Sequence, residues 1–369
     1  MNIKELTMKT DELIKSNPYS LSSNEKNKIF LDSMKESIQF HYDNCKDYKN
    51  FCEKKTFDPI NFEKLESIPF LPVSLFKKIE LISVPKNEII RTIHSSSTSG
   101  NLPSIINLDK ITVKRQIIML NSILKNFFDD EKPSFLIIDH DSTINSNDLE
   151  LSSRGSAIRG MLGFSKDFFF LLNDELQFDF KKISDALKNA DKNKTCIFGF
   201  TWLIYKIITN DYPEEIKNLF QKLNNAFVVH IGGWKKLSDQ SVDKNSFNKT
   251  ISKFFNTKPE NVVDFYGTTE QLGLVFPDCK KGYKHVPIFA EILIRDIHDQ
   301  SVLPFNTSGF IQILCPVPNS YPGVSILTDD IGEILGEDDC PCGRKGKYFV
   351  FKKRSEIADP KGCGDTLAI

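Results

Sequence analysis

The spacing of apolar residues separates a polar, helical first part of the chain from a longer part in which strands and helices alternate. Over residues 23–43, apolar side chains recur at near-helical intervals and predict an amphipathic helix. Residues 68–73 (IPFLPV) contain two prolines, so we expect an extended connector there. Residues 1–90 are therefore expected to form a helical segment that precedes the main part of the fold.

Short apolar runs after residue 90 predict buried strands. The runs that end at glycine or polar residues, with helical patterns nearby, are typical of parallel strands. They are residues 135–139 (FLIID), 196–200 (CIFGF), 226–231 (AFVVHI) and 262–266 (VVDFY). After about residue 285 the pattern changes to short strands separated by Pro and Gly turns, as in residues 310–315 (FIQILC). The sequence thus predicts an α/β fold with a β-rich C-terminal third.

Composition and charge exclude several classes of protein. The 369 residues carry 48 Lys and Arg against 49 Asp and Glu, a balance that argues against a dedicated nucleic-acid binder. No apolar run reaches the roughly 18 residues that span a membrane, and residues 1–16 lack the apolar core of a secretory signal. We therefore expect a cytoplasmic protein without a membrane span. The 30 Phe residues supply ample core and leave open a cavity for an apolar ligand; we favour core for most of them.

The eight cysteines favour metal ligation or thiol chemistry, because a chain without an export signal rarely carries a disulfide framework. Cys279 and His285 in one segment and Cys340 and Cys342 in another supply three thiolates and an imidazole, a tetrahedral set for structural zinc. The alternative is four ordinary reduced residues. Four further cysteines are expected to be small buried apolar residues: Cys45, Cys52, Cys196 and Cys315.

Cys363 stands apart from the other cysteines. It lies between two glycines near the end of the chain, downstream of a basic stretch at residues 352–354. Basic neighbours lower a thiol pKa, and a mobile tail can carry a thiolate to a distant centre. The alternative is an exposed thiol without a function.

Residues 94–104 (HSSSTSGNLPS) form a loop rich in hydroxyl groups. Its hydroxyl and backbone N–H donors could hold a phosphate. The loop lacks the GK[ST] signature of a P-loop, which disfavours a kinase or ATPase of that type. A flexible surface linker is the alternative interpretation.

Two loops follow predicted strands and could contact a nucleotide. Gly232 and Gly233 come after the apolar run ending at Ile231, where a ligand can approach the backbone; a plain turn is the alternative. Residues 265–270 (FYGTTE) combine an aromatic ring, hydroxyls and a carboxylate that could hold a nucleotide with its metal. Glu270 could equally be a solvated residue at a helix N-terminus.

Asp329 and Asp330 follow the apolar run at residues 324–327. Neighbouring residues of a strand point to opposite faces, so we expect at most one of them to face a ligand. Acceptance of hydrogen bonds from ribose hydroxyls is one interpretation, and an acidic turn is the other.

In this order, the motifs resemble the acyl-protein synthetases of bacterial bioluminescence and the related phenylacetate–CoA ligases, within the AMP-forming adenylating superfamily. Residues 39–42 (QFHY) and 68–77 (IPFLPVSLFK) look like the N-terminal region of the acyl-protein synthetases. The resemblance continues through the hydroxyl-rich loop, residues 232–236 (GGWKK), 285–287 (HVP) and 321–332, and ends at 361–363 (KGC). It therefore covers almost the whole chain.

The resemblance implies an adenylating large domain of layered sheets and helices. We expect this α/β domain to span residues 91–350, with residues 1–90 packed on it. Residues 351–369 would be a short tail in place of the family's mobile C-terminal domain. The set Cys279, His285, Cys340 and Cys342 looks like that of the phenylacetate–CoA ligase branch, where some members bind zinc.

The resemblance also implies roles for single residues. The ATP phosphates would be held by Ser95, Ser96, Ser97, Thr98, Ser99 and Gly100. Gly232 and Gly233 would line the adenine and acyl pocket, and Tyr266, followed by Gly267 and Thr268, would pack near the adenine.

Four further residues receive roles close to the reaction. Glu270 would help to hold Mg²⁺, Asp330 would bind the ribose hydroxyls, and Arg354 looks like the basic residue at the hinge. Cys363 matches the family's thiol near the C-terminus, which accepts the acyl group before a reductase receives it. One departure is Ser97, which stands where the family has glycine.

These motifs predict an AMP-forming acid–thiol ligase. It would activate a carboxylic acid, expected to be a fatty acid, with ATP and Mg²⁺, and transfer the acyl group to a cysteine. An acyl-accepting reductase or carrier protein would be its partner. Two alternatives remain open: a carboxylate–CoA ligase, and a catalytically silent binding protein stabilised by zinc, for which Ser97 is the best support.

Overall fold

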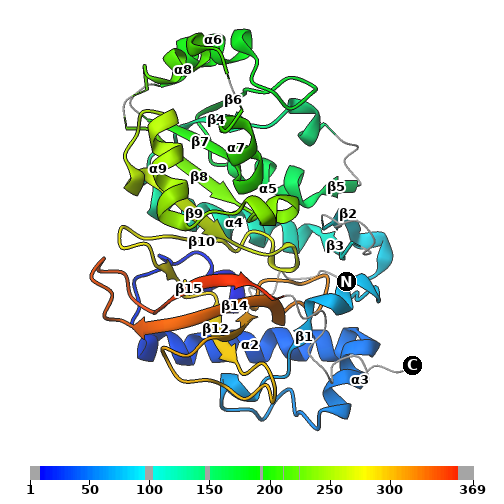
Figure 1. The fold of residues 1–369 in the computed structure, drawn as a ribbon. Helices are drawn as coiled ribbons and strands as arrows, with labels where there is room; N and C mark the ends of the chain where they lie inside the picture. Colours follow the sequence, from blue (N-terminus) through cyan, green and yellow to red (C-terminus); the bar gives the residue numbers. More distant parts are fainter. Residues whose placement is uncertain are drawn as a thin grey trace. The chain divides into compact units, whose positions relative to one another are not determined.

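The computed structural model describes residues 9–95, 103–145, 150–191, 194–210, 212–223 and 225–355. Within these ranges the chain forms two compact units (Figure 1). The first unit contains the described residues up to 123 and those from 268 onward, and the second contains the described residues of 124–267. The predicted division at residues 90 and 350 stays a prediction.

The second unit is built on parallel strands in the order β9–β8–β7–β4–β6. Their bounds are β4 Ser134–Ile138, β6 Asp167–Phe170, β7 Thr195–Phe200, β8 Phe227–Ile231 and β9 Val262–Tyr266. The helices are α5 Ser153–Leu162, α6 Phe180–Asn189, α7 Thr201–Ile208, α8 Glu214–Phe220 and α9 Lys244–Phe254. Strand β5 (Glu150–Ser152) and the short 3-10 helices η4 Asp141–Ile144, η5 Lys235–Gln240 and η6 Pro259–Asn261 complete it. The parallel strands expected from the four apolar runs are confirmed to within a residue at either end.

Aromatic side chains fill the interior of the second unit. The ring of Phe220 lies 5.4 Å from that of Phe178, 5.7 Å from Phe254 and 5.0 Å from Phe255. Among the described residues, 18 Phe side chains are buried, so core packing accounts for most of the 30 Phe residues of the sequence.

The first unit contains an antiparallel sheet in the order β11–β15–β14–β13–β12, with β1 pairing in parallel with β14. The bounds are β1 Leu71–Pro72, β11 Lys284–His285, β12 Glu291–Arg295, β13 Gly309–Leu314, β14 Ser325–Glu337 and β15 Lys347–Arg354. Strands β2 Ile89–His94 and β3 Ile105–Asp109 form an antiparallel pair. The remaining short elements are β10 Phe276–Pro277, η1 Leu65–Ser67, η2 Val73–Lys77, η3 Lys86–Glu88 and η7 Thr269–Gln271. Strand β14 is longer than the short strands expected after residue 285, because β-bulges against β13 and β15 let one strand continue.

Helices of the first unit come mostly from the N-terminal part of the chain, as predicted. They are α1 Lys9–Leu13, α2 Ser23–Asn44, α3 Lys46–Lys54 and α4 Lys110–Phe127, of which α4 begins in this unit. A capping box formed by Ser22 and Glu25 starts α2. The helix buries Phe30, Met34 and Ile38 at i, i+4 and i+8, which is the face that the apolar pattern predicts.

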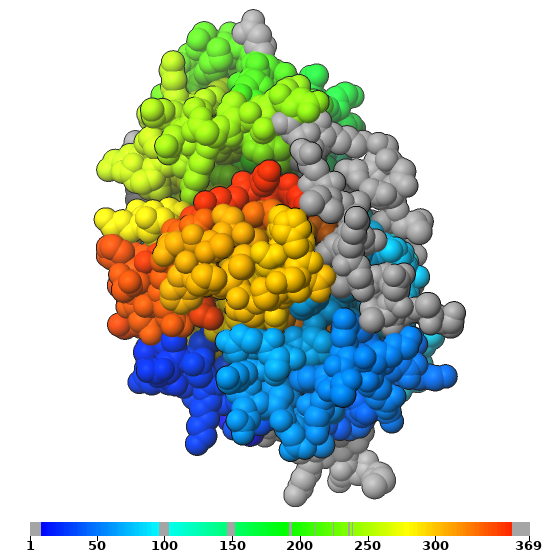
Figure 2. All heavy atoms as spheres, turned by 60° about the horizontal axis from the view of Figure 1, so that its bottom comes forward, coloured from blue at the N-terminus to red at the C-terminus, as the bar shows by residue number. Residues whose placement is uncertain are grey.

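The segment before β1 lies against the strand pair β12–β13. The guanidinium of Arg295 donates a hydrogen bond to the carbonyl oxygen of Glu66 (2.8 Å) and lies over the ring of Phe70. Figure 2 shows this part of the first unit, with residues near 60 in light blue beside residues near 300 in orange and yellow. Among the described residues, no helix has the length and apolar content needed to cross a membrane.

Candidate functional site

Glu270 is a buried carboxylate at the start of the 3-10 helix η7. Only 7% of its surface is exposed, so the alternative of a solvated helix-end residue is wrong. Burial raises the pKa of Glu270, and the Ser104 hydroxyl and the positive charges of Lys77 and Arg354 oppose this rise. The Tyr321 hydroxyl donates to the carbonyl oxygen of Glu270 at 2.8 Å and fixes its backbone. A buried carboxylate close to two cations is a reasonable place for an anionic ligand with its metal.

Ser95 and Ser104 close the base of the hydroxyl-rich loop. The backbone N–H of Ser95 donates to the carbonyl oxygen of Ser104 at 3.0 Å, and the N–H of Ser104 donates to the Ser95 hydroxyl at 2.7 Å. Residues 96–102 lie outside the described residues, and with them the predicted phosphate contacts of Ser96, Ser97, Thr98, Ser99 and Gly100. Sequence reasoning gave Ser104 and Lys77 no role, although both lie inside the motifs that carried the family resemblance.

Asp329 and Asp330 lie inside β14 rather than at its end. Arg354 of β15 stands opposite Asp330 in the strand register, and its guanidinium lies 3.6 Å from the carboxylate of Asp329. The N–H of Ser355 donates to the carbonyl oxygen of Asp329 at 2.7 Å. The two acidic residues and the predicted hinge arginine therefore occupy one short stretch of paired strands in the first unit.

Gly232 and Gly233 directly follow β8, and Tyr266 ends the neighbouring strand β9. Because Ile231 pairs with Phe265 in a parallel register, both strands end at the same edge of the sheet. Gly232 has a φ of +89°, and a Cβ there would lie 2.7 Å from the ring of Phe200. Gly233 has a φ of +62° with open space where its side chain would be. These positions therefore need glycine, and they leave backbone accessible at the carboxyl edge, where α/β sheets bind ligands.

The predicted nucleotide-binding residues thus come from both units. Ser95, Thr268, Glu270, Asp330 and Arg354 belong to the first unit, and Gly232, Gly233, Tyr266 and Gly267 to the second. Their individual roles stay predictions.

Cys279, His285, Cys340 and Cys342 come together in the first unit. Their ligand atoms all lie within 4.8 Å of one another, and Cys342 Sγ is 3.2 Å from His285 Nε2. Pairing of β11 with β15 places His285 opposite Tyr348, and the turn between β14 and β15 carries the two later cysteines. The structure therefore brings together the four residues that the sequence grouped, and they could hold a metal ion.

The electrostatics of this cluster suit a bound cation. Burial, followed by the positive charge of Arg344, lowers the pKa of His285 to about 4, so its imidazole is neutral and able to ligate at pH 7. Burial raises the pKa of the Cys340 thiol to about 12. A cation would be required to hold such a buried thiol as a thiolate.

The four cysteines expected to be small buried residues are all buried: Cys45, Cys52, Cys196 and Cys315. Burial raises the pKa of each, which disfavours a reactive thiolate at these positions. Cys363, the predicted acyl acceptor, lies outside the described residues.

The chain has the fold of the large domain of AMP-forming ligases. The structure resembles that of a 2-hydroxyisobutyryl-CoA ligase in an open conformation, in complex with 2-HIB-AMP and CoA. The TM-score is 0.71 at 13% sequence identity, over 93% of this chain and 78% of that chain. The sequence narrows this class to a family. Residues 1–369 match the family described as "Acyl-protein synthetase, LuxE", and the chain belongs to it.

Two relatives agree with this assignment. The long-chain-fatty-acid–luciferin-component ligase of Vibrio harveyi is 27% identical, over 100% of this chain and 94% of that protein. The protein of the same name from Aliivibrio fischeri is 24% identical, over 97% of this chain and 93% of its own length. The predicted family, fold class and enzyme class are confirmed: the protein is an acyl-activating ligase.

Proposed function

We propose that this protein activates a fatty acid with ATP as an acyl-adenylate and transfers the acyl group to the thiol of Cys363. The observation that carries the proposal is the buried carboxylate of Glu270 beside Ser104, Lys77 and Arg354, in a chain that belongs to the acyl-protein synthetases over its full length. The names of the two relatives support a long-chain fatty acid as the substrate. Use of ATP and of reduced thiols agrees with the expected cytoplasmic location.

In the first half-reaction, a carboxylate oxygen of the fatty acid attacks the α-phosphorus of ATP, and pyrophosphate leaves. Mg²⁺, when held by Glu270, would neutralise charge on the phosphate oxygens. The hydroxyl and N–H donors of residues 95–100 would orient the phosphates, and Asp330 would accept hydrogen bonds from the ribose. Arg354 lies across the strand pair from Asp330 and would limit repulsion between the acidic residues and the nucleotide.

In the second half-reaction, the thiolate of Cys363 attacks the acyl carbonyl carbon, AMP leaves, and a thioester forms. An acyl-accepting reductase or carrier protein would then take the acyl group. If coenzyme A were the acceptor instead, its addition would release acyl-CoA and leave Cys363 unlabelled.

We further propose that Cys279, His285, Cys340 and Cys342 hold a structural Zn²⁺. Three sulfur atoms and one imidazole nitrogen within 4.8 Å of one another match the preferred zinc donor set and number. The ion would tie the segment after β10 to the turn between β14 and β15.

Carboxylate-dependent exchange of labelled pyrophosphate into ATP tests the adenylation step. We expect exchange with saturated acids in a series from butanoate to octadecanoate, rising toward the longer chains. Glu270→Gln should reduce it at least about 100-fold, because it removes the proposed metal ligand. The matched control, Glu260→Gln, changes an exposed carboxylate and should leave exchange unaltered. Absence of exchange with every acid would refute the proposal.

A further inference from the structure

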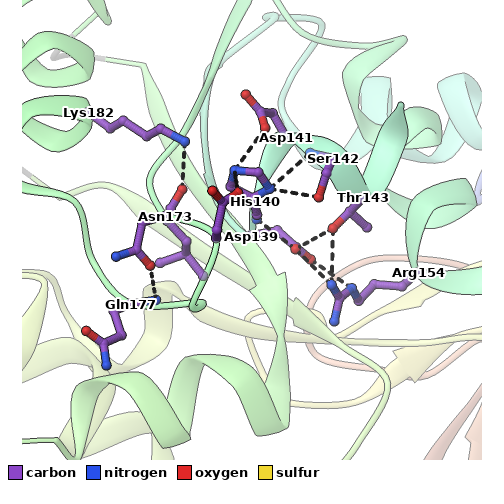
Figure 3. Close-up of polar contacts among 11 residues, drawn as sticks. Asp139, His140, Asp141, Ser142, Thr143, Arg154, Asn173, Gln177 and Lys182 are labelled. Atoms are coloured by element: carbon purple, nitrogen blue, oxygen red, sulfur yellow. Dashed lines mark hydrogen bonds and ion pairs between the residues drawn. The ribbon is translucent and has the colours of Figure 1, made fainter. Parts of the chain in front are cut away.

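His140 lies between a serine hydroxyl and two carboxylates at the carboxyl end of β4 (Figure 3). Its Nδ1 is 2.7 Å from the Ser142 hydroxyl oxygen. Its Nε2 is 3.0 Å from a carboxylate oxygen of Asp174 and 3.1 Å from one of Asp141. All four residues belong to the second unit, and none of them has a role in the adenylation chemistry proposed above.

The hydrogen bonds fix the protonation of the ring. The backbone N–H of Ser142 donates to Nδ1 at 3.3 Å, so Nδ1 must carry the lone pair and Nε2 the proton. Nε2–H then donates to the carboxylates, and the Ser142 hydroxyl donates to Nδ1. This is the pattern of a nucleophile, a general base and an orienting acid, with the two ring nitrogens exchanged relative to the serine proteases.

A buried ion pair holds this arrangement in place. Asp139 is 1% exposed, and its carboxylate accepts hydrogen bonds from the His140 N–H at 2.8 Å and from the Thr143 hydroxyl at 2.7 Å. The guanidinium of Arg154 contacts both carboxylate oxygens of Asp139, each at 3.1 Å. Figure 3 shows Asp139, Thr143 and Arg154 joined by these contacts beside the His140–Ser142 turn. The nucleophile and the base therefore sit on a rigid support, which catalytic groups require.

The position in the sheet is one where α/β proteins bind ligands. After β4 the chain forms β6 on one side of β4 and then returns to form β7 on the other side. The carboxyl end of β4 is thus a switch point of the strand order, and ligands bind at such points. Ser142 is exposed, and the His140 side chain is 15% exposed, so an ester can reach them.

An apolar surface for an acyl chain lies along the edge strand. Phe170 of β6 pairs with Ile137 of β4, and its ring packs 6.2 Å from that of Phe168, which is 44% exposed. The edge strand of the same sheet therefore exposes an aromatic ring that could contact an acyl chain.

We propose that Ser142, His140 and Asp174 form a second acyl-transfer centre, which hydrolyses acyl esters or thioesters. Ser142 Oγ attacks the acyl carbonyl carbon and forms an ester bond. The hydroxyl proton passes to His140 Nδ1 and then to the departing thiol or alcohol as its bond to the acyl carbon breaks. Water then attacks the acyl-serine, His140 takes up its proton, and the carboxylic acid leaves as Ser142 regains a proton. The preference for acyl groups rests on the proposed function; the nucleophile itself does not.

Labelling with a fluorophosphonate bearing a long alkyl chain tests the nucleophile without ATP. The full-length Cys363→Ser variant is used, so that the tail thiol cannot react. We expect one adduct, mapped by peptide mass spectrometry to Ser142, and ATP-independent hydrolysis of p-nitrophenyl octanoate. Ser142→Ala should abolish both, and His140→Gln should slow both at least about 100-fold.

The matched control is Ser246→Ala, which removes another exposed serine of the second unit whose hydroxyl binds a carboxylate (Asp243, 2.6 Å) without an imidazole. It should leave the adduct and the hydrolysis unchanged. The peptide map of the unaltered Ser142 protein decides the matter even if a variant folds poorly. Absence of an adduct, or an adduct on another residue, would show that His140 only caps the helix η4. Pyrophosphate exchange by the same protein would show that such a failure leaves the adenylation proposal intact.

Discussion

The two units differ in what their interiors contain most prominently: the first has Lys–carboxylate pairs with both partners buried, and the second has a cluster of packed Phe rings, its Asp139–Arg154 pair being partly exposed at the arginine. In the first unit, the ammonium of Lys26 on α2 lies 2.8 Å from the carboxylate of Glu291 on β12, with 1% and 4% of the side chains exposed. Lys347 of β15 lies 3.2 Å from the other oxygen of the same carboxylate. Asp278 and Lys284 form a second buried pair beside the Cys/His cluster.

The stability of the second unit depends on the packing of bulky side chains in its interior. Phe220 has no exposed surface and touches three other Phe rings. Aromatic packing is insensitive to pH and to metal, whereas buried charges and metal ligands respond to both. We therefore expect acid and metal removal to destabilise the first unit, and loss of aromatic side-chain volume to destabilise the second.

Removal of the metal should have the largest effect, and only through the first unit. Cys342→Ser removes one of four zinc ligands, and should lower the free energy of unfolding by on the order of 5 kcal/mol, because structural zinc contributes its binding energy to folding. Denaturant unfolding with elemental analysis of the protein checks this. Cys45→Ala, a buried thiol outside the cluster, should keep the metal. The zinc proposal would be contradicted if elemental analysis found no metal in the unaltered protein and its unfolding curve coincided with that of Cys342→Ser.

A cavity in the aromatic core should rank next. Phe220→Ala should cost about 4 kcal/mol, because a fully buried ring is lost and its neighbours cannot collapse completely. Phe180→Ala removes a ring that is 52% exposed and should cost less than about 1 kcal/mol. Equal losses in the two variants, measured by denaturant unfolding, would mean that the rings do not support the second unit.

Lys26→Met should cost about 3 kcal/mol, since it leaves a buried carboxylate with one cation instead of two. Because Lys347 still neutralises Glu291, the loss of stability should be near the lower end of the range observed when a buried ion pair is broken. Lys28→Met, on an exposed position of the same helix, is the control. Unfolding curves that coincide for the two variants would show that the buried pair contributes nothing.

The stability of the first unit should fall in acid. Burial opposes ionisation of Glu291, but Lys26 and Lys347 outweigh it and lower the pKa of Glu291 from 4.5 to about 2. A carboxyl group whose pKa is lower in the folded protein than in the unfolded chain stabilises the fold at pH values above the pKa of the unfolded chain. This contribution disappears as the pH falls from about 4.5 toward 2. We expect a loss of about 2 kcal/mol between pH 5 and pH 3 (on the scale of about 1.4 kcal/mol per pKa unit). Glu291→Gln should flatten this pH dependence, whereas Phe220→Ala should retain it; an unchanged slope in Glu291→Gln would count against the assignment.

An exposed ion pair should contribute least. Lys86 and Glu80 lie 2.8 Å apart, but 79% and 48% of their side chains are exposed. Lys86→Met should therefore change stability by less than about 0.5 kcal/mol. A loss as large as that of Lys26→Met would show that burial is not what distinguishes the charges of the first unit.

The sequence predicted the parallel strands of the second unit well because each is a short apolar run with a breaker at its end. It also grouped Cys279, His285, Cys340 and Cys342 correctly, since few residue types ligate zinc. The sequence did not reveal the role of Lys26. This residue lies on the same helix face as Phe30 and Met34, four and eight residues later, but its local sequence is that of a surface lysine on a polar helix. Its partner Glu291 is 265 residues away, and no local pattern encodes such a pairing.

The same limit applied to the candidate sites. Glu270 was singled out from its motif, but Ser104 and Tyr321, which interact with it, come from distant segments. No local spacing pairs His140 with an acid, because its carboxylate partner Asp174 lies on a turn that comes later in the chain. In both cases the residue type was visible in the sequence, and the environment that gives it chemistry required the fold.

The most direct test of the central claim follows the acyl group itself. The protein is incubated with ATP, Mg²⁺ and the radiolabelled fatty acid that gives the fastest pyrophosphate exchange, and the protein-bound label is then treated with neutral hydroxylamine. We predict an ATP-dependent label that hydroxylamine removes and that Cys363→Ser abolishes, while pyrophosphate exchange by that variant continues. Label that persists in Cys363→Ser, or exchange without any protein-bound label, would contradict transfer of the acyl group to this cysteine.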